Sequence, residues 1–329
     1  MARYLLVGGA GFIGAHVARR LLDADDEVVV LDAGVDYGRS PPAQTRALLE
    51  WRRRALLDGA EVVTGDAGDA ALLRALLARC APERIVHLGN LPLADLAAAD
   101  SAAARASIVD VTADVLAAAA ALARPPSLTY VSSSMVYGDF ATDPMGEAGP
   151  LRPRSPYGRL KLAAERRLSA AARSAGLGLT IVRPSAVYGP GDVNGRVLQR
   201  LVDAATAQAP FVLTAAPATP IDFTWVQDVA AGIHAASLRT AGAPRAYNVT
   251  SGAARTIAAA VDIVRTLVPG LDVVTGQRDP TVPRRGSLDT GRARQELGWR
   301  PEWTLERGLD AYLAFARSVA AAPAAPAAA

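Results

Sequence analysis

The sequence of this 329-residue chain predicts an α/β fold: a doubly wound parallel sheet followed by a smaller C-terminal α/β domain. Two observations predict it. Short runs rich in β-branched residues alternate with helical runs rich in Ala, Leu and Arg, which is typical of a parallel sheet covered on both faces. The alternation then breaks after Pro184, where Gly and Pro loop signals begin.

The first domain is expected over residues 1–183, with segments near 222–240 returning to it. Its strands are predicted from apolar and β-branched runs at 4–7, 27–31, 61–63, 84–87, 128–132 and 180–182. Its helices are predicted at 14–24, 70–79, 100–123 and 156–175. Residues 184–318 are expected to form mainly the second domain.

In the second domain, we predict helices at 196–207 and 256–267 and a strand at 245–249, followed by a Pro- and Arg-rich stretch at 279–286. Residues 319–329 are an Ala/Pro tail of low complexity, which we expect to be disordered.

Composition excludes several classes of protein. A net charge of +3 with dispersed arginines does not favour nucleic-acid binding, and Arg52–Arg54, the one tight basic run, is interpreted as a solvated helix face. No uninterrupted apolar run reaches membrane-span length. Cys80 is the single cysteine and is expected in the core; the three histidines have no metal-ligand spacing. The strand pattern begins within four residues of Met1, which leaves no signal peptide, so a cytoplasmic protein is expected.

A glycine-rich turn, Gly8-Gly-Ala-Gly11-Phe12-Ile13-Gly14, follows the first predicted strand and opens a helix. Glycines permit the tight turn and let backbone N–H groups approach a pyrophosphate, while the helix N-terminus attracts the anion. A glycine turn made only for packing is the alternative. Its position between strand and helix favours a Rossmann-type dinucleotide site.

Carboxylates follow the next two strands. Asp32 is placed to accept hydrogen bonds from ribose hydroxyls and to repel a 2′-phosphate, which favours NAD over NADP. Arg39 could soften this preference, although a solvated loop arginine is the simpler interpretation. Asp66 is placed to bind the adenine amino group, or else Asp66 or Asp69 caps the helix that begins near residue 70.

Tyr157 and Lys161 are the predicted catalytic pair. Ser155 is a good N-cap and Pro156 a good first helical residue, so a helix starts there and both side chains share one face. We expect the ammonium of Lys161 and an oxidised nicotinamide to lower the pKa of Tyr157, which makes it a general base. Lys161 is the sole lysine among 35 basic residues, which argues against chance surface neighbours.

Ser133 ends a predicted strand, at the sheet edge where ligands of open α/β sheets bind. It could hold the substrate hydroxyl that Tyr157 deprotonates; a serine that only caps a loop is the alternative.

Together these motifs resemble the extended short-chain dehydrogenase/reductase family, in its NAD-dependent sugar-nucleotide epimerase/dehydratase branch. Further matches lie at residues 183–190, 222–228, 247–252 and 289–299, so the resemblance extends from Tyr4 to about Arg317. It implies NAD as cofactor, contacted also by Leu88, a nucleotide-sugar substrate, catalysis by Ser133, Tyr157 and Lys161, and a homodimer built from the helices at 100–123 and 156–175. It also implies substrate contacts from Ser134, Asn194 and Arg278; Arg284 and Arg285 are rivals for the diphosphate.

Differences between this sequence and the family pattern indicate which of the family's reactions the chain catalyses. Its dehydratases carry an acid just after the catalytic Ser or Thr, where this chain has Ser134 and Met135. We therefore predict a nucleotide-sugar 4-epimerase that acts through a transient 4-keto intermediate, most simply on a UDP-hexose or UDP-hexuronate. A 4-dehydrogenase or 4-ketoreductase with net cofactor turnover is the alternative, followed by a 4,6-dehydratase and by a non-catalytic NAD-binding scaffold.

Overall fold

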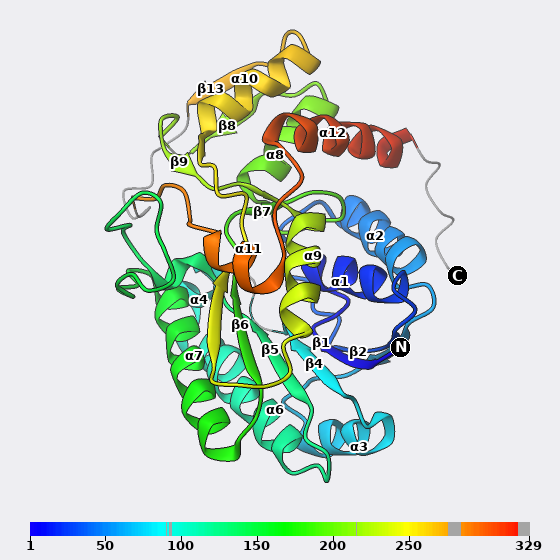
Figure 1. Ribbon diagram of the computed structural model, residues 1–329. Coiled ribbons are helices and arrows are strands. Elements are labelled where there is room, and N and C mark those ends of the chain that lie inside the picture. The colour runs from blue at the N-terminus through cyan, green and yellow to red at the C-terminus, as the bar shows by residue number, and fades with distance from the viewer. Residues whose placement is uncertain (90, 92–93, 215, 276–283, 322–329) are drawn as a thin grey trace, which may run out of the picture.

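The computed structural model describes residues 1–89, 91, 94–214, 216–275 and 284–321. Its centre is a seven-stranded parallel sheet in the spatial order β11-β6-β5-β4-β1-β2-β3 (Figure 1). The strands are β1 (Arg3–Val7), β2 (Glu27–Asp32), β3 (Glu61–Thr64), β4 (Arg84–His87), β5 (Ser127–Val131), β6 (Leu179–Arg183) and β11 (Arg245–Asn248).

Both faces of this sheet are covered, as the pattern of buried residues in β1 shows. Tyr4 and Leu6 belong to one core cluster, with α1 (Phe12–Leu22) and α9 (Val226–Ser237). Leu5 and Val7 belong to the cluster on the opposite face, where α3 (Ala70–Cys80), α6 (Val111–Ala120) and α7 (Pro156–Ala175) pack. Successive side chains of a strand point to opposite faces, so this alternation confirms the doubly wound α/β architecture.

The six strands predicted in the first part of the sequence are all present, each end within one residue of the expected one. The strand predicted at 245–249 is also present, but we placed it in the C-terminal domain and this is wrong. As β11 it pairs in parallel with β6, for example Tyr247 with Val182, and so forms an edge of the central sheet. The chain returns to the sheet through α9, which packs against α1.

Two helix predictions and the predicted start of the C-terminal tail also differ from the structure. The first helix begins at Phe12 rather than Gly14, because Gly11 is its N-cap. The helix predicted at 100–123 is interrupted: α5 (Ser101–Arg105), a π-helical turn η2 (Ala106–Asp110) and α6 follow one another. The helix α12 (Leu305–Ala321) continues to 321, so residues 319–321 are helical and not part of a tail; residues 322–329 lie outside the described part.

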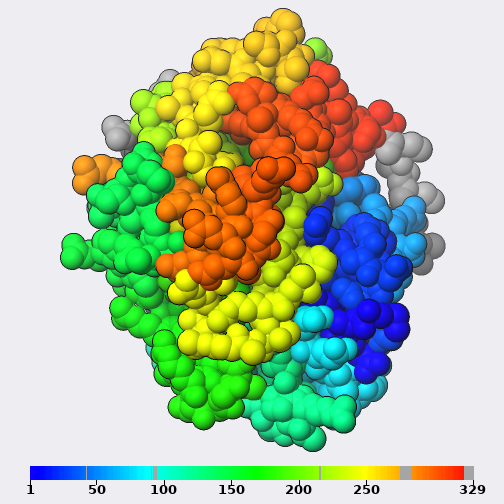
Figure 2. Space-filling view, viewed as in Figure 1, coloured from blue at the N-terminus to red at the C-terminus, as the bar shows by residue number. Residues whose placement is uncertain are grey.

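The C-terminal segments form a separate core above the sheet. Here α8 (Val197–Thr206), α10 (Ile257–Leu267) and α12 pack around β8 (Phe211–Leu213) and β13 (Val273–Thr275). In the space-filling view these segments lie directly against the sheet domain (Figure 2). The remaining elements are α2 (Pro42–Trp51), η1 (Arg52–Leu56), α4 (Ala94–Ala99), η3 (Ser134–Val136), β7 (Val187–Tyr188), β9 (Pro220–Ile221), β10 (Thr224–Trp225), β12 (Arg255–Thr256) and α11 (Gly291–Leu297). Cys80 is buried, as expected.

Candidate active site

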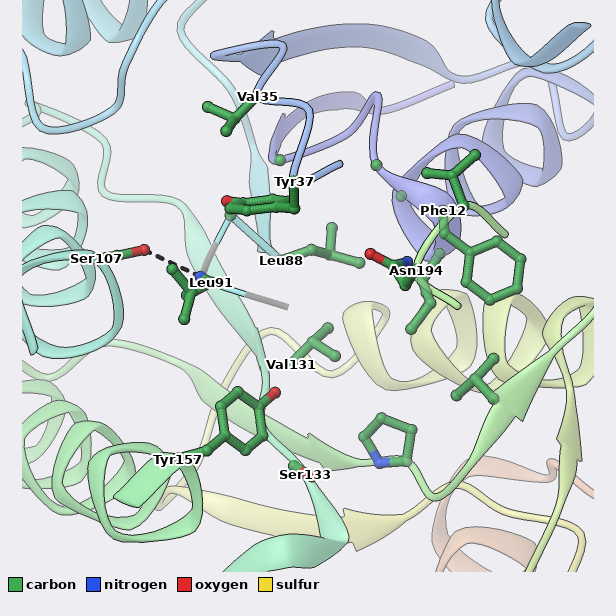
Figure 3. Close-up of a pocket in the computed structure, with 18 of the residues that line it drawn as sticks. Phe12, Val35, Tyr37, Leu88, Leu91, Ser107, Val131, Ser133, Tyr157 and Asn194 are labelled. Carbon is green, nitrogen blue, oxygen red and sulfur yellow. Dashed lines mark hydrogen bonds between the residues drawn. The ribbon is translucent and has the colours of Figure 1, made fainter. Parts of the chain in front are cut away.

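A cavity of about 800 Å³ opens at the carboxyl ends of the central strands. Its walls combine the glycine turn after β1 with residues of the C-terminal segments such as Asn194 and Phe223. Most of the predicted site residues lie around it: Gly8, Gly11, Phe12, Ile13, Gly14, Asp32, Asp66, Leu88, Ser133, Ser134, Tyr157, Lys161 and Asn194. Tyr157 and Ser133 lie on one side of the cavity, opposite Val35 and Tyr37 (Figure 3).

The glycine turn is a close backbone cradle. Gly8 has a φ of +79°, and a Cβ added there would lie 2.4 Å from the backbone of Gly89. A Cβ on Gly14 would lie 2.4 Å from the carbonyl oxygen of Gly8. Side chains are therefore excluded at both positions, and the first turn of α1 can approach an anion closely, as a bound pyrophosphate requires.

Asp32 ends β2 and is held by the backbone on both sides. Its Oδ2 accepts from the Ala10 N–H at 2.9 Å and its Oδ1 from the Gly34 N–H at 2.8 Å. Arg39 does not neutralise it, because the Arg39 guanidinium forms an ion pair with Asp95 at 2.7 Å. The carboxylate thus lies in the cavity wall beside the glycine turn, where ribose hydroxyls could bind it.

Of the two roles considered for the acids after β3, helix capping belongs to Asp69. Asp69 caps α3, since its Oδ1 accepts from Ala71 N–H at 2.9 Å and Leu72 N–H at 3.0 Å. The Asp66 carboxylate accepts from the Gly68 N–H at 2.8 Å, and Asp66 lines the cavity. Adenine binding by Asp66 stays a prediction.

The helix that carries Tyr157 and Lys161 starts as the sequence indicates. Ser155 caps it by accepting from the Gly158 N–H at 3.1 Å, and Pro156 occupies its first turn. Both predicted catalytic side chains line the cavity. Lys161 Nζ donates to the Val131 carbonyl at 2.9 Å and lies 5.7 Å from the centre of the Tyr157 ring.

The pKa of Tyr157 is shifted upward in the protein without cofactor, so a lowering by Lys161 together with an oxidised nicotinamide stays a prediction. Desolvation in the cavity raises the pKa of Tyr157 to about 12. Burial also lowers the pKa of Lys161 to about 7, against a weaker opposing effect of Glu165. The sequence shows the spacing of the pair but not its desolvation, which acts against the charged form of both groups.

Ser133 caps a short helix and also lines the cavity, so its binding of the substrate hydroxyl stays a prediction. Its Oγ accepts from the Met135 N–H at 3.2 Å and so caps the short helix η3, while the residue also lines the cavity near Tyr157 (Figure 3). Ser134 is buried, with its N–H donating to the Pro184 carbonyl at 2.9 Å. Asn194 is tied to Asp192, to which its amide donates at 2.7 Å.

The three candidate diphosphate arginines differ in position. Arg278 lies outside the described residues. Arg284 is exposed and does not line the cavity. Arg285 is half-buried, lines the cavity and contacts Met135.

One residue of the cavity wall contradicts the sequence interpretation. Arg52 was assigned to a solvated helix face, yet it is buried: Nε donates to the Gly191 carbonyl at 2.8 Å and Nη1 to that of Ala10 at 3.1 Å. Its Nη2 is buried without a hydrogen-bond partner among the described residues. Buried side chains at positions 45, 48, 52 and 56 recur at helical spacing, a signal that could have identified the inward face.

The residues present fit a dinucleotide such as NAD. The glycine turn, where Gly8 and Gly14 leave the space that a Cβ would fill, can hold a pyrophosphate. Asp32 lies in the same cavity wall, and the unpartnered Nη2 of Arg52 provides a buried cation there. Within the described residues, no group of three or more His, Cys, Asp or Glu could hold a metal ion. None of the described helices has the length and apolar character of a bilayer span.

Known proteins with similar sequences and folds include sugar-nucleotide 4-epimerases and dTDP-glucose 4,6-dehydratases. The sequence pattern of the "NAD dependent epimerase/dehydratase family" matches residues 4–250. A UDP-glucose 4-epimerase from Mycolicibacterium smegmatis is 30% identical, over 96% of this chain and 99% of the relative. A dTDP-L-rhamnose 4-epimerase from Burkholderia thailandensis is 28% identical, over 93% of each chain.

Among solved structures, a UDP-glucuronic acid 4-epimerase from Bacillus cereus, in complex with UDP-glucuronic acid and NAD, has the same fold. Its TM-score is 0.86 at 22% identity, with 96% of this chain and 99% of that chain covered.

Proposed function

This chain belongs to the NAD-dependent epimerase/dehydratase family, and from this premise we propose that it is a nucleotide-sugar 4-epimerase. One observation carries the proposal: Ser133, Tyr157 and Lys161 line the same cavity as the glycine turn, and no acid follows Ser133. UDP-hexoses and UDP-hexuronates are the proposed substrates, as in the named relatives.

Bound NAD supplies a hydride acceptor and donor that is regenerated in each turnover. Ser133 holds the C4 hydroxyl of the sugar by a hydrogen bond, and Tyr157 removes its proton. Lys161 fixes Tyr157 from the same helix face, and the resulting 4-keto sugar is reduced on its opposite face as Tyr157 returns the proton. Since Ser134 and Met135 cannot protonate a leaving hydroxyl, elimination is disfavoured.

We further propose that residues 1–183 bind NAD and that residues 184–318 mainly bind the nucleotide sugar. A homodimer is proposed through the helical faces at 100–123 and 156–175, as the family resemblance implies. A cytoplasmic location, expected from the sequence, is also proposed; the buried free thiol of Cys80 is compatible with it.

The decisive experiment follows substrate and cofactor together. Purified protein is incubated with UDP-, dTDP- and GDP-hexoses and with UDP-glucuronate, products are identified by proton NMR, and the absorbance of reduced cofactor is recorded. We expect inversion at C4 with no accumulation of reduced cofactor. Stoichiometric accumulation would indicate the rival 4-dehydrogenase, and no change at any C4 would refute the proposal.

A further inference from the structure

Arg285 places a guanidinium at the catalytic end of the cavity. The residue is half-buried, lines the cavity with Ser133 and Tyr157, and its Nη2 contacts Met135 Sδ. Its backbone segment is fixed from both sides. Phe140 N–H donates to the Arg284 carbonyl at 3.0 Å, and Met145 N–H donates to that of Ser287 at 2.9 Å.

This guanidinium forms no ion pair with a described carboxylate. The acids of the facing loop are engaged elsewhere: Asp139 accepts from the Arg284 N–H at 2.8 Å and pairs with Arg154, and Asp143 accepts from the Ser287 N–H at 2.9 Å. Burial lowers the pKa of Arg285 to about 10, so it stays a cation at neutral pH.

The other cations of the cavity wall are each held by groups of the chain, although Arg52 keeps its Nη2 without a partner among the described residues, beside the glycine turn. Arg196 pairs with Asp192 at 2.8 Å, Arg52 donates to two backbone carbonyls, and Lys161 donates to the Val131 carbonyl. A partly desolvated cation without a counterion is unfavourable. Arg285 therefore makes its part of the cavity favourable for an anionic group of a ligand.

The position of Arg285 indicates which group that is. Met135, which it contacts, donates its N–H to Ser133 Oγ at 3.2 Å. A Cβ added to Gly158, the residue after Tyr157, would lie 2.5 Å from the Met135 carbonyl oxygen. Arg285 thus contacts a residue that is hydrogen-bonded to Ser133 and packed against Gly158, the neighbour of Tyr157.

A hexopyranose presents its substituents in a fixed order. C1, which carries the diphosphate, lies across the ring from C4, whereas the substituent of C5 is adjacent to C4. When C4 faces Ser133 and Tyr157, a cation beside these residues is therefore close to the C5 substituent and remote from the diphosphate. An anion at that place is a carboxylate on C5.

The geometry points to a nucleotide hexuronate as substrate, with Arg285 binding its C5 carboxylate. This inference rests on the proposed 4-epimerase function and selects one of its two substrate classes. A planar guanidinium can bind a carboxylate through two parallel hydrogen bonds, which an uncharged CH₂OH group cannot reproduce. The named relatives act on both classes, so it is this arginine that distinguishes them here.

The test compares UDP-glucuronate with UDP-glucose, in the purified enzyme with NAD. For the wild type, we expect kcat/KM to favour UDP-glucuronate by about 10- to 100-fold, the range of a hydrogen bond to a charged group. Arg285→Met should abolish the preference by raising KM for UDP-glucuronate by a similar factor, with a much smaller effect on KM for UDP-glucose. Arg284→Met is the matched control, because it removes the same charge from the exposed neighbouring residue, and it should retain the preference.

Two results would overturn the inference. Wild-type enzyme that favours UDP-glucose contradicts it directly. An equal loss on both substrates in Arg285→Met assigns the arginine to a group that they share, such as the diphosphate.

Calorimetric binding of the two nucleotide sugars separates this inference from the proposed reaction. If no C4 inversion occurs, but UDP-glucuronate binds more tightly through Arg285, the epimerase proposal fails and the carboxylate site stands. If neither sugar is preferred in binding, the inference fails whatever the reaction.

Discussion

The hydroxyl of Tyr157 extends into the cavity beside Ser133 (Figure 3). Tyr157→Phe removes this one oxygen and leaves the ring in place. We predict that kcat falls by about 10²- to 10⁴-fold, the usual range for a general acid–base group, while the melting temperature and NAD affinity change little. Steady-state kinetics and thermal unfolding with and without NAD measure the two effects. Retained activity would favour the non-catalytic scaffold.

The lowered pKa of Lys161 leads to a prediction of how the stability of the folded protein depends on pH. Its pKa is lowered to about 7 in the folded protein, against about 10.5 when unfolded, so between these values the unfolded chain binds more protons. The free energy of unfolding should therefore rise with pH from about 7, by at most about 1.4 kcal/mol per pH unit.

Denaturant titrations between about pH 7 and 9 measure this slope. This range lies above the usual pKa of histidine and below that of tyrosine, so these residues contribute little to it. Lys161→Met removes the titrating group and should flatten the profile. The same slope in wild type and variant would show that other groups cause it.

At the scale of the element, a buried network holds the catalytic helix α7 against the sheet. Glu165, one turn after Lys161, forms a buried ion pair with Arg183 of β6, with Nε to Oε1 at 3.0 Å and Nη2 to Oε2 at 2.6 Å. Arg183 Nη1 also donates to the Tyr137 hydroxyl at 3.0 Å, which donates to Asn248 of β11 at 2.7 Å. One network thus connects α7, two sheet strands and the segment that follows Ser133.

Glu165→Ala should be severely destabilising because it leaves the Arg183 cation buried without a counterion. Removing one partner of a buried pair costs about 3–5 kcal/mol of unfolding free energy, measurable by urea titration. The control is Glu27→Ala, which removes an acid from the exposed pair with Arg3 and should change stability little. Similar effects of the two substitutions would argue against the network as an anchor of α7.

Individual helices and strands also show which features can be predicted from the sequence and which cannot. Strand positions and the start of α7 at Ser155-Pro156 were correct because they depend on local patterns: β-branched runs, a cap and a proline. The sheet position of β11 was missed because strand pairing joins segments far apart in the chain.

Non-local packing also explains what the sequence does not predict within the site. The inward orientation of Arg52 depends on contacts with Ala10 and Gly191, and Arg285 meets Met135 from 150 residues away. The direction of the Tyr157 pKa shift depends on desolvation, which spacing along a helix does not determine.

At the scale of the whole molecule, the cavity joins the sheet domain to the C-terminal segments. Its walls include Gly8 and Asp32 of the sheet domain and Asn194 and Phe223 of the C-terminal segments. A ligand that binds only the folded chain stabilises it by RT ln(1 + [L]/Kd), about 2.7 kcal/mol at a hundredfold excess over Kd. NAD should therefore raise the melting temperature by several degrees.

NADP should raise the melting temperature less than NAD at equal concentration. The Asp32 carboxylate is held by two backbone N–H groups in the cavity wall, and Arg39, which we considered as a neutralising cation, pairs with Asp95 instead. A 2′-phosphate would meet this charge and be repelled. Asp32→Asn keeps an acceptor oxygen but removes the charge, so the difference between the two cofactors should narrow in this variant. Equal stabilisation of the wild type by NAD and NADP would mean that Asp32 does not face the ribose, and the orientation of the cofactor inferred from the glycine turn would have to be reversed.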